Sequence, residues 1–308
     1  MIKTIYIRRG NMLDFRMETF VTVCKYMNYT KAANALHITQ PAVSQHMRHI
    51  EEEYGVKLFE FQGKKLFLTK DGRALLNMAV TWQHDDQALR RKFQENAAGQ
   101  RHLIFGVTLT IGEYVIGDYL AGYMKKHPHT QIRLTIANTE GLLKKLDEGE
   151  IDFAVVEGYF EKSDYDFQLF RKERYIGVAS PYGAKVKMSG EKCGWPRIFG
   201  ETVIVREQGS GTREVLERAL REDGYQIGDF DNVVEISNMN AIKSIVMGGG
   251  GISFLYEAAV KKEIGEGSLV ELPVEGFPKY HDFTFIWRKN SIFSQQYKEL
   301  LCQMTNAT

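Results

Sequence analysis

The feature that most constrains the fold is a pair of short helical patterns close to the start of the chain. Thr30 is a suitable N-cap for a first short helix over residues 31–36, whose alanines let a neighbouring helix approach closely. Thr39 is a suitable N-cap for a second helix, and Pro41 fits its first turn because the N–H groups there have no intrahelical partner. The second helix is expected to end near Gly55. Two helices joined by a tight turn in this way are typical of a helix-turn-helix.

The second helix of this pair has one apolar and one polar side. Val43, Met47 and Ile50 recur at helical spacing and form the apolar side. The polar side carries Gln40, Ser44, Gln45, Arg48 and His49. Glutamine can pair with an adenine edge, arginine with guanine, and serine with a base or a phosphate, which predicts a helix that reads the DNA major groove. Each of these residues taken alone is more typical of a solvated surface, so the prediction depends on the whole arrangement.

A short hairpin is predicted to follow, with strands over 56–58 and 65–68 and a tip at Gln62-Gly63-Lys64. Lys64 and Lys65 place two positive charges at this tip, where they can contact phosphates as the wing of a winged helix. Phosphate contacts set the register and the salt-dependent part of the affinity, whereas base contacts choose the sequence. The predicted DNA-binding residues are therefore Thr30, Gln40, Pro41, Ser44, Gln45, Arg48, His49, Lys64 and Lys65.

The distribution of charge along the chain fits this interpretation. The net charge of the whole chain is +1. Residues 1–100 contain 15 Lys and Arg against 10 Asp and Glu, while residues 101–308 contain 25 against 29. A basic first third next to an acidic remainder indicates a nucleic-acid partner for the first part only. The imbalance is small, and a surface a few charges from neutral is also common.

Residues 70–99 are predicted as one long amphipathic helix that Thr69 caps and that no proline interrupts. Its apolar positions include Leu75, Ala79, Trp82 and Phe93. A helix of this length between two domains usually packs on a copy of itself, which predicts a homodimer. The periodicity fits packing against its own domain equally well.

Beyond residue 100, strand and helix patterns alternate. Strands are expected over 103–107, 131–137 and 151–156, with helices between them, and a second such set begins near residue 202. This order predicts two α/β lobes with a cleft between them, built on parallel strands with right-handed crossovers. Lobe I is expected to cover about 100–173 and 268–308, and lobe II about 174–267.

Several classes of protein are excluded by what the sequence lacks. No stretch approaches the roughly 18 uninterrupted apolar residues that a membrane-spanning helix needs. Cys24, Cys193 and Cys302 are far apart and form no CxxC pair, so neither a disulfide framework nor a zinc site is expected. The first residues do not match a secretory signal. We therefore expect a cytoplasmic protein with no membrane, metal or cofactor partner.

Several motifs resemble those of LysR-type transcriptional regulators. They are Thr30-Lys31-Ala32-Ala33, Leu36-His37-Ile38-Thr39-Gln40-Pro41-Ala42-Val43-Ser44 and Leu68-Thr69-Lys70-Asp71-Gly72. The similarity runs nearly unbroken from Leu13 to Leu76, and the remaining chain is similar to the family's effector domain in length and element order. The resemblance implies a mixed α+β and α/β fold. Its parts are a winged helix-turn-helix over 12–69, a linker and dimerisation helix over 70–99, and a two-lobed, periplasmic-binding-protein-like effector domain over 100–308.

The resemblance also implies the partners. Members of the family bind double-stranded promoter DNA, respond to a small-molecule effector between the two lobes, and usually form homotetramers as dimers of dimers. RNA polymerase is a further candidate partner. Two features depart from the family pattern. Phe61 stands where an arginine is usual, and members commonly begin near Met12, which makes residues 1–11 either an extension or the result of a misassigned start.

Ligands of open α/β sheets bind beyond the carboxyl ends of the strands. In the second lobe, Gln208-Gly209-Ser210-Gly211-Thr212-Arg213 opens a helix, and its glycines, hydroxyls and helix N-terminus suit a small anion. The alternatives are simple helix caps for Ser210 and Thr212, and pairing with Glu217 for Arg213. The predicted effector-binding residues at these strand ends are Thr108, Thr110, Asn138, Thr139, Gln208, Ser210, Gly211 and Thr212.

An enzyme or a small-molecule-binding protein on the same two-lobed fold is the alternative function. The sequence contains no GxxxxGK phosphate loop and no HExxH zinc helix, and the run Gly248-Gly249-Gly250-Gly251 does not match a dinucleotide-binding loop. No histidine has a nucleophile partner visible in the sequence, so no catalytic residue is predicted. We therefore expect a DNA-binding regulator rather than an enzyme.

Overall fold

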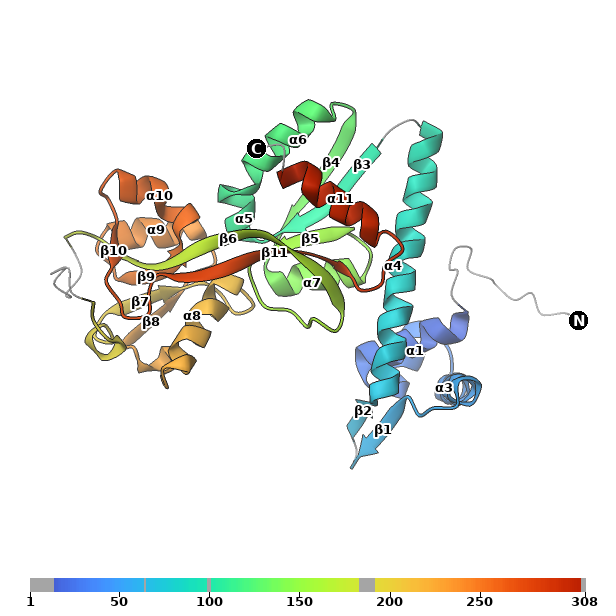
Figure 1. The fold of residues 1–308 in the computed structure, drawn as a ribbon. Helices are drawn as coiled ribbons and strands as arrows, with labels where there is room; N and C mark the ends of the chain where they lie inside the picture. Colours follow the sequence, from blue (N-terminus) through green and yellow to red (C-terminus); the bar gives the residue numbers. More distant parts are fainter. Residues whose placement is uncertain (1–13, 64, 99–100, 183–191, 306–308) are drawn as a thin grey trace, which may run out of the picture.

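The computed structural model describes residues 14–63, 65–98, 101–182 and 192–305. Figure 1 shows a small helical domain at one end of a long helix, with a larger two-lobed domain beside the rest of that helix. Lys64, predicted to contact phosphates, and residues 1–11, expected as an extension, fall outside the described residues.

The first domain contains the predicted helix-turn-helix. Its elements are α1 (Phe15–Tyr26), α2 (Tyr29–Leu36), α3 (Gln40–Tyr54), β1 (Phe59–Gln62) and β2 (Lys65–Leu68). Thr39 caps α3 as predicted, because its hydroxyl accepts a hydrogen bond of 3.3 Å from the N–H of Ala42. The predicted cap of α2 is wrong. Asn28 caps this helix in place of Thr30, since the Asn28 side chain accepts a hydrogen bond from the N–H of Lys31.

The first strand of the hairpin begins later than the sequence predicted. Residues 56–58 bond to Glu51 near the end of α3 and to Thr69, which follows β2, and not to β2 itself. The N–H of Val56 donates to the carbonyl of Glu51, and the N–H of Leu58 donates to the Glu51 carboxylate. Because these groups already have partners, the pairing of β1 with β2 starts only at Phe59.

One apolar core holds the first domain together. Phe20 and Val23 of α1 pack with Val43, Met47 and Ile50 of α3, and all five are almost completely buried. Burying a side chain of this kind contributes about 1.5–3 kcal/mol. This packing fixes which side of α3 faces inward, and it therefore turns the opposite, polar side toward solvent.

Helix α4 (Lys70–Ala98) connects the two domains as one unbroken helix. Its apolar residues lie on two sides of the helix. Leu75 and Ala79 are buried in the core of the first domain, whereas Trp82 and Phe93 are 53% and 62% exposed. The exposed pair lies three turns apart on one side of the helix. Helix α4 thus packs within the chain on one side and presents aromatic side chains to solvent on another.

The second domain is built on a sheet that has nine strands among the described residues. The order is β4-β3-β5-β11-β6-β9-β7-β8, and β10 pairs with β6. The outer strands on each side are parallel as predicted, but β6 and β11 are antiparallel to each other and to their neighbours. The predicted parallel arrangement is therefore wrong at the centre of the sheet. The strands are β3 (Arg101–Val107), β4 (Thr130–Ile136), β5 (Phe153–Val156), β6 (Tyr165–Ala179), β7 (Thr202–Val205), β8 (Asn232–Glu235), β9 (Ile252–Tyr256), β10 (Val270–Leu272) and β11 (Lys279–Arg288).

Two long strands connect the lobes. One end of β11 pairs with β5, while the far end of β6 pairs with β9 in the other lobe. In Figure 1 these two strands run side by side from one lobe to the other. The sequence did not predict β6, because the charged run Arg171-Lys172-Glu173-Arg174 interrupts its apolar pattern.

Helices flank the sheet in both lobes (Figure 1). The lobe that contains β3, β4 and β5 has α5 (Leu109–Tyr114), α6 (Ile116–Lys126), α7 (Thr139–Asp147) and α11 (Ser294–Thr305). The lobe that contains β7, β8 and β9 has α8 (Gly211–Glu222), α9 (Met239–Met247) and α10 (Glu257–Gly265).

Candidate nucleic-acid interface and effector site

The polar side of α3 is open to solvent. Gln40, Gln45, Arg48 and His49 are exposed, and Ser44 is half-buried. The side-chain amide of Gln40 donates a hydrogen bond of 2.9 Å to the Ser44 hydroxyl, which holds the two side chains together at the start of the helix. The structure therefore presents a continuous row of hydrogen-bonding groups on a helix whose other side is fixed in the core.

The remaining predicted DNA-binding residues lie around this row. Thr30 on α2 and Pro41 in the first turn of α3 are exposed, as is Lys65 at the start of β2. Phe61, which stands where the family usually has an arginine, is 68% exposed on β1. The hairpin thus presents a positive charge and an aromatic ring to solvent.

His46 belongs to the same helix but has a structural role. Its Nδ1 atom lies 3.0 Å from the Thr19 hydroxyl, and its ring packs edge-on against Phe15. Burial lowers the pKa of His46, and Arg16 lowers it further, so its ring is neutral near pH 7. His46 therefore joins α3 to α1 and adds no charge to the exposed row.

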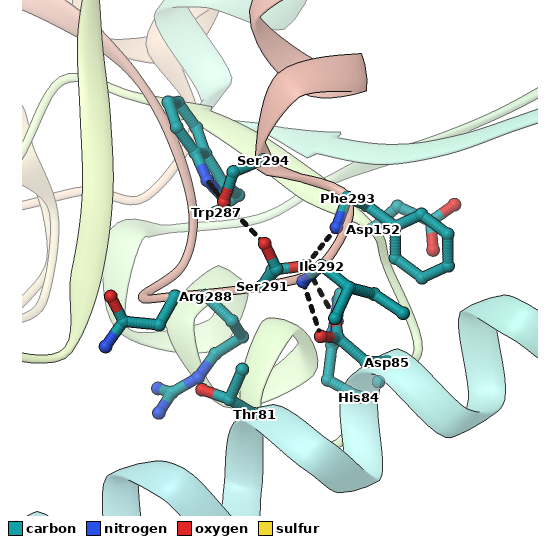
Figure 2. Close-up of polar contacts among 12 residues, drawn as sticks. Thr81, His84, Asp85, Asp152, Trp287, Arg288, Ser291, Ile292, Phe293 and Ser294 are labelled. Atoms are coloured by element: carbon teal, nitrogen blue, oxygen red, sulfur yellow. Dashed lines mark hydrogen bonds and ion pairs between the residues drawn. The ribbon is translucent and has the colours of Figure 1, made fainter.

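A buried polar network joins α4 to the effector domain, as Figure 2 shows. The Asp85 carboxylate accepts hydrogen bonds from the Ser291 hydroxyl at 2.6 Å and from the N–H of Ile292 at 2.9 Å. His84 is completely buried, and its Nε2 atom donates to the carbonyl of Ile151 at 3.2 Å. These contacts fix the middle of α4 to two segments that are distant in the sequence, so sequence patterns gave no signal for them.

The network contains serine, histidine and aspartate, but it is not a catalytic triad. In a triad the serine is bonded to the histidine, which is bonded to the aspartate. Here Ser291 donates directly to Asp85, and all three side chains are buried (Figure 2). The arrangement accounts for the buried polar groups without giving a reactive nucleophile.

Further contacts extend the same joint along α4. The Arg288 guanidinium donates to Asp147 at 2.7 Å and to the carbonyl of Asn77 at 3.4 Å. The Thr81 hydroxyl donates to the carbonyl of Lys289 at 3.1 Å. The helix that leaves the DNA-binding domain is thereby attached to the lobe that contains β5 and α11.

Five of the predicted effector-binding residues have buried hydroxyls at the junction of the two lobes. Thr108 and Thr110 come from the start of α5, Thr139 from the start of α7, and Ser210 and Thr212 from the start of α8. Within the described residues, the hydroxyls of Thr139 and Ser210 make no hydrogen bond, whereas those of Thr108, Thr110 and Thr212 face the Glu157 carboxyl group. Buried polar groups are nearly always paired, so these unpartnered oxygens mark the junction as a candidate ligand site.

The other predicted residues contribute differently. Asn138 caps α7, because its side-chain oxygen accepts from the N–H of Gly141 at 2.9 Å. Gln208 is exposed. Ser210 occupies the N-cap position of α8 but makes no cap hydrogen bond. Arg213 pairs with Glu217 at 2.7 Å and with Glu235, so its charge is already neutralised.

Glu157, which the sequence analysis missed, lies at the centre of the hydroxyl cluster. It follows β5 directly, is almost completely buried, and accepts a hydrogen bond of 2.8 Å from the Thr212 hydroxyl in the other lobe. Burial raises the pKa of Glu157, while the nearby hydroxyls of Thr212 and Thr110 and the charge of Arg206 oppose the rise. Its only signal in the sequence was an acidic residue directly after an apolar strand.

The two lobes meet backbone to backbone beside Glu157. A methyl group on Gly211 would lie 2.6 Å from the backbone nitrogen of Gly158, so only glycine fits at this position of α8. The N–H of Tyr159 donates to Glu214 at 3.2 Å, and the Tyr159 ring lies against the Arg218 guanidinium. One side of α8 therefore closes directly onto the loop that follows β5.

The described residues contain neither a candidate membrane-spanning helix nor a candidate metal site. Among the described helices, none combines the length and apolar character that crossing a membrane requires. In the same parts of the chain, no group of three or more His, Cys, Asp or Glu side chains is placed to hold a metal ion.

Comparison with known proteins identifies both domains. The family model "Bacterial regulatory helix-turn-helix protein, lysR family" matches residues 15–73, and the model "LysR substrate binding domain" matches residues 96–306. Over 290 residues the chain is 30% identical to the HTH-type transcriptional activator CmpR of Synechocystis, and 93% of each chain is covered.

Solved structures share the fold. OxyR of Corynebacterium glutamicum has a TM-score of 0.60 at 20% identity, covering 95% of this chain and 91% of that chain. The regulatory domain of CcmR from Synechocystis, solved in complex with 2-PG, has a TM-score of 0.58 at 23% identity, covering 68% of this chain and 98% of that chain. The chain belongs to the LysR family of bacterial helix-turn-helix transcriptional regulators, with a DNA-binding domain at its start and an effector-binding domain after the long helix.

Proposed function

We propose that the exposed side of α3 reads base edges in promoter DNA. The observation that carries this proposal is the division of α3 into a core side, with Val43 and Met47, and a solvent side, with Gln40 and Arg48. Glutamine and arginine are the side chains that pair with adenine and guanine in the major groove. Lys65 supplies a phosphate contact from the hairpin. A gel-shift assay with DNA from upstream of the protein's own gene and its neighbours tests this proposal; binding that is no tighter than to unrelated DNA would contradict it.

The effector is bound between the lobes, and it is a small anion. Thr139 and Ser210 place hydroxyls at the N-termini of α7 and α8, where the helix dipoles favour negative charge. CcmR, which has the same fold, binds 2-PG in its regulatory domain. The expected result is that Ser210→Ala with Thr139→Val removes the anion response and leaves DNA affinity unchanged. An unchanged response in this double variant would exclude both hydroxyls from the site.

The chain works as three units and as an oligomer. We assign DNA binding to residues 12–69, subunit pairing to 70–99, and effector binding to 100–308. The exposed aromatic residues of α4 are the surface on which a second copy packs, and two dimers assemble into a tetramer that contacts RNA polymerase. We infer that the protein acts in the cytoplasm as a regulator and not as an enzyme, which the similarity to transcriptional regulators supports.

The mechanism is a shift between two arrangements of the lobes. Thr212 and Glu157 bond across the junction, and Tyr159 bonds to Glu214 beside them, so the lobes have a defined closed arrangement. A ligand that binds this arrangement more tightly than an open one increases its population. Because α4 is attached to the lobe that contains β5, closure moves the other lobe relative to α4 and so changes how the subunits of the oligomer place their DNA-binding domains. Effector and DNA then change each other's affinity by the same factor.

A further inference from the structure

The carboxyl group of Glu157 lies at the centre of the proposed effector site, although a carboxylate repels an anion. One oxygen, Oε1, accepts from the Thr212 hydroxyl, while the other, Oε2, has no partner of normal hydrogen-bond geometry within the described residues, although the Thr110 and Thr108 hydroxyls lie near the carboxyl group. We propose that Glu157 Oε2 and the ligand atom facing it share one proton, so that the site selects an oxyanion carrying a hydrogen-bond donor and rejects one with acceptors only. This inference rests on the proposed function, because it assigns chemistry to the same site between the lobes.

The position of Oε2 follows from the residues around it. Gly211, the residue before Thr212, lies against both Gly158 and the Glu157 side chain, and Thr139 packs on Gly158. The unpartnered hydroxyls of Thr139 and Ser210 therefore belong to the same small region as the unpartnered Oε2.

A buried positive charge lies on the opposite side of the junction. Arg206 follows β7 in one lobe as Glu157 follows β5 in the other, and it is only 2% exposed. Its Nε and Nη2 atoms bond to Glu207, whereas Nη1 has no partner within the described residues. The charge of Arg206 is close enough to lower the pKa of Glu157. Arg206 is thus paired with Glu207 but keeps one N–H group, on Nη1, that can donate to a ligand.

The proton requirement follows from the hydrogen-bonding capacity of a carboxyl group. An ionised carboxylate only accepts, so it can face a ligand O–H or N–H but not a bare oxygen. A bare oxygen can bind there only after Glu157 takes up a proton and becomes the donor. In both cases the contact holds one proton, and a ligand that brings its own proton avoids the cost of protonating Glu157.

The other titratable groups at this place do not supply the proton. His281 donates from Nε2 to the backbone carbonyl of Glu157 at 2.7 Å, and burial lowers its pKa. Burial raises the pKa values of Tyr159, Tyr175 and Tyr256. These four side chains are therefore neutral around pH 7, and Arg206 remains charged.

Hydrogen phosphate and sulfate test the inference directly. At about pH 8 both are doubly charged tetrahedral anions of similar size, but only phosphate carries a proton. Calorimetric titration of the full-length protein should show that the wild type binds phosphate at least about tenfold more tightly than sulfate. Glu157→Gln places an amide donor at the same position, so it should remove or reverse this preference. Glu161→Gln, which changes an exposed acid nearby, should keep it.

Two results would overturn the inference in distinguishable ways. The first is that the wild type binds both anions with equal affinity and that Ser210→Ala weakens both. The anion site would then stand, but Glu157 would not select between the anions. Binding of neither anion to the wild type or to Glu157→Gln would overturn the anionic effector as well. DNA binding in the same preparation would show that the DNA-reading function stands independently.

A second measurement covers the case in which Glu157→Gln does not fold. The wild type should bind sulfate more tightly at about pH 6 than at about pH 8, because protonated Glu157 donates to the sulfate oxygen. Burial lowers the pKa of His281, which reduces the contribution of that side chain to the pH dependence. A sulfate affinity that does not change with pH would contradict the shared proton.

Discussion

The hydroxyl of Ser291 donates a hydrogen bond of 2.6 Å to the carboxylate of Asp85, and it joins α4 to the effector domain across 206 positions of the sequence. The same carboxylate accepts from the N–H of Ile292 (Figure 2). One buried side chain therefore fixes the long helix to the segment that precedes α11. We infer that this lobe and α4 move as one body and that the other lobe is the part that moves when the effector binds.

Replacing Asp85 tests this joint. Asp85→Asn keeps the shape of the side chain but removes its charge and places an amide N–H₂ where one of the two donors now bonds. The free energy of unfolding should fall by about 1–3 kcal/mol, as measured by chemical denaturation. Glu299→Gln, which changes an exposed acid on α11, should alter it by less than about 0.5 kcal/mol. Equal stability of Asp85→Asn and the wild type would show that the network does not hold the helix.

Gly211→Ala tests closure of the lobes. The added methyl group would lie 2.6 Å from the backbone nitrogen of Gly158, so the lobes cannot reach the same closed arrangement. We expect the variant to fold and bind DNA but to lose at least about tenfold in anion affinity, because the ligand then cannot contact both lobes. Gly228→Ala has open space around its new methyl group and should bind the anion normally. Normal anion affinity in Gly211→Ala would show that anion binding does not require the contact between Gly211 and Gly158.

The exposed aromatic side of α4 predicts subunit pairing. Trp82→Ser with Phe93→Ser removes two large apolar contacts from this side while leaving the buried side unchanged. The variant should dissociate to monomers at concentrations where the wild type is dimeric or larger, as measured by light scattering after size-exclusion chromatography. Gln94→Ser, an exposed change beside Phe93, should keep the oligomer. An unchanged mass in the double variant would place the interface elsewhere.

The raised pKa of Glu157 predicts how stability depends on pH. The folded chain holds this proton to a higher pH than the unfolded chain, whose carboxyl titrates near 4.5. Wild-type stability therefore loses this contribution as the pH rises from about 4.5 through the raised folded value. Glu157→Gln does not titrate, so its melting temperature should rise relative to that of the wild type over this range. A difference in melting temperature between Glu157→Gln and the wild type that stays constant with pH would contradict the raised pKa of Glu157.

Much of the first domain could be predicted from the sequence because local rules determine it. The apolar spacing of Val43, Met47 and Ile50 and the cap at Thr39 define α3 without reference to the rest of the chain. The local rules failed at α2. Both Asn28 and Thr30 are suitable N-cap residues, and the helix begins after Asn28. Two suitable capping residues lie close together there, and only the folded backbone decides between them.

The effector domain was harder to predict because its central features come from distant segments. Strand β6 carries charged residues that interrupt its apolar pattern, yet it is paired on both sides by β11 and β9. The hydroxyls at the strand ends were expected to be near the ligand, whereas Glu157 was not noticed. Its significance depends on the contact with Thr212, which lies 55 positions later in the chain.

The measurement that tests the central claim most directly is the DNA specificity of a double change on α3. Fluorescence anisotropy would compare the affinity for the fragment upstream of the gene with that for a scrambled duplex at the same salt concentration. Gln40→Ala with Arg48→Ala should lose about 1–3 kcal/mol of specific binding per base contact and keep its non-specific affinity. Lys65→Ala should weaken both affinities alike and reduce their salt dependence. A double variant that keeps the wild-type specificity ratio, or a wild type that binds no duplex at low salt, would contradict the assignment of α3 as the DNA-reading element.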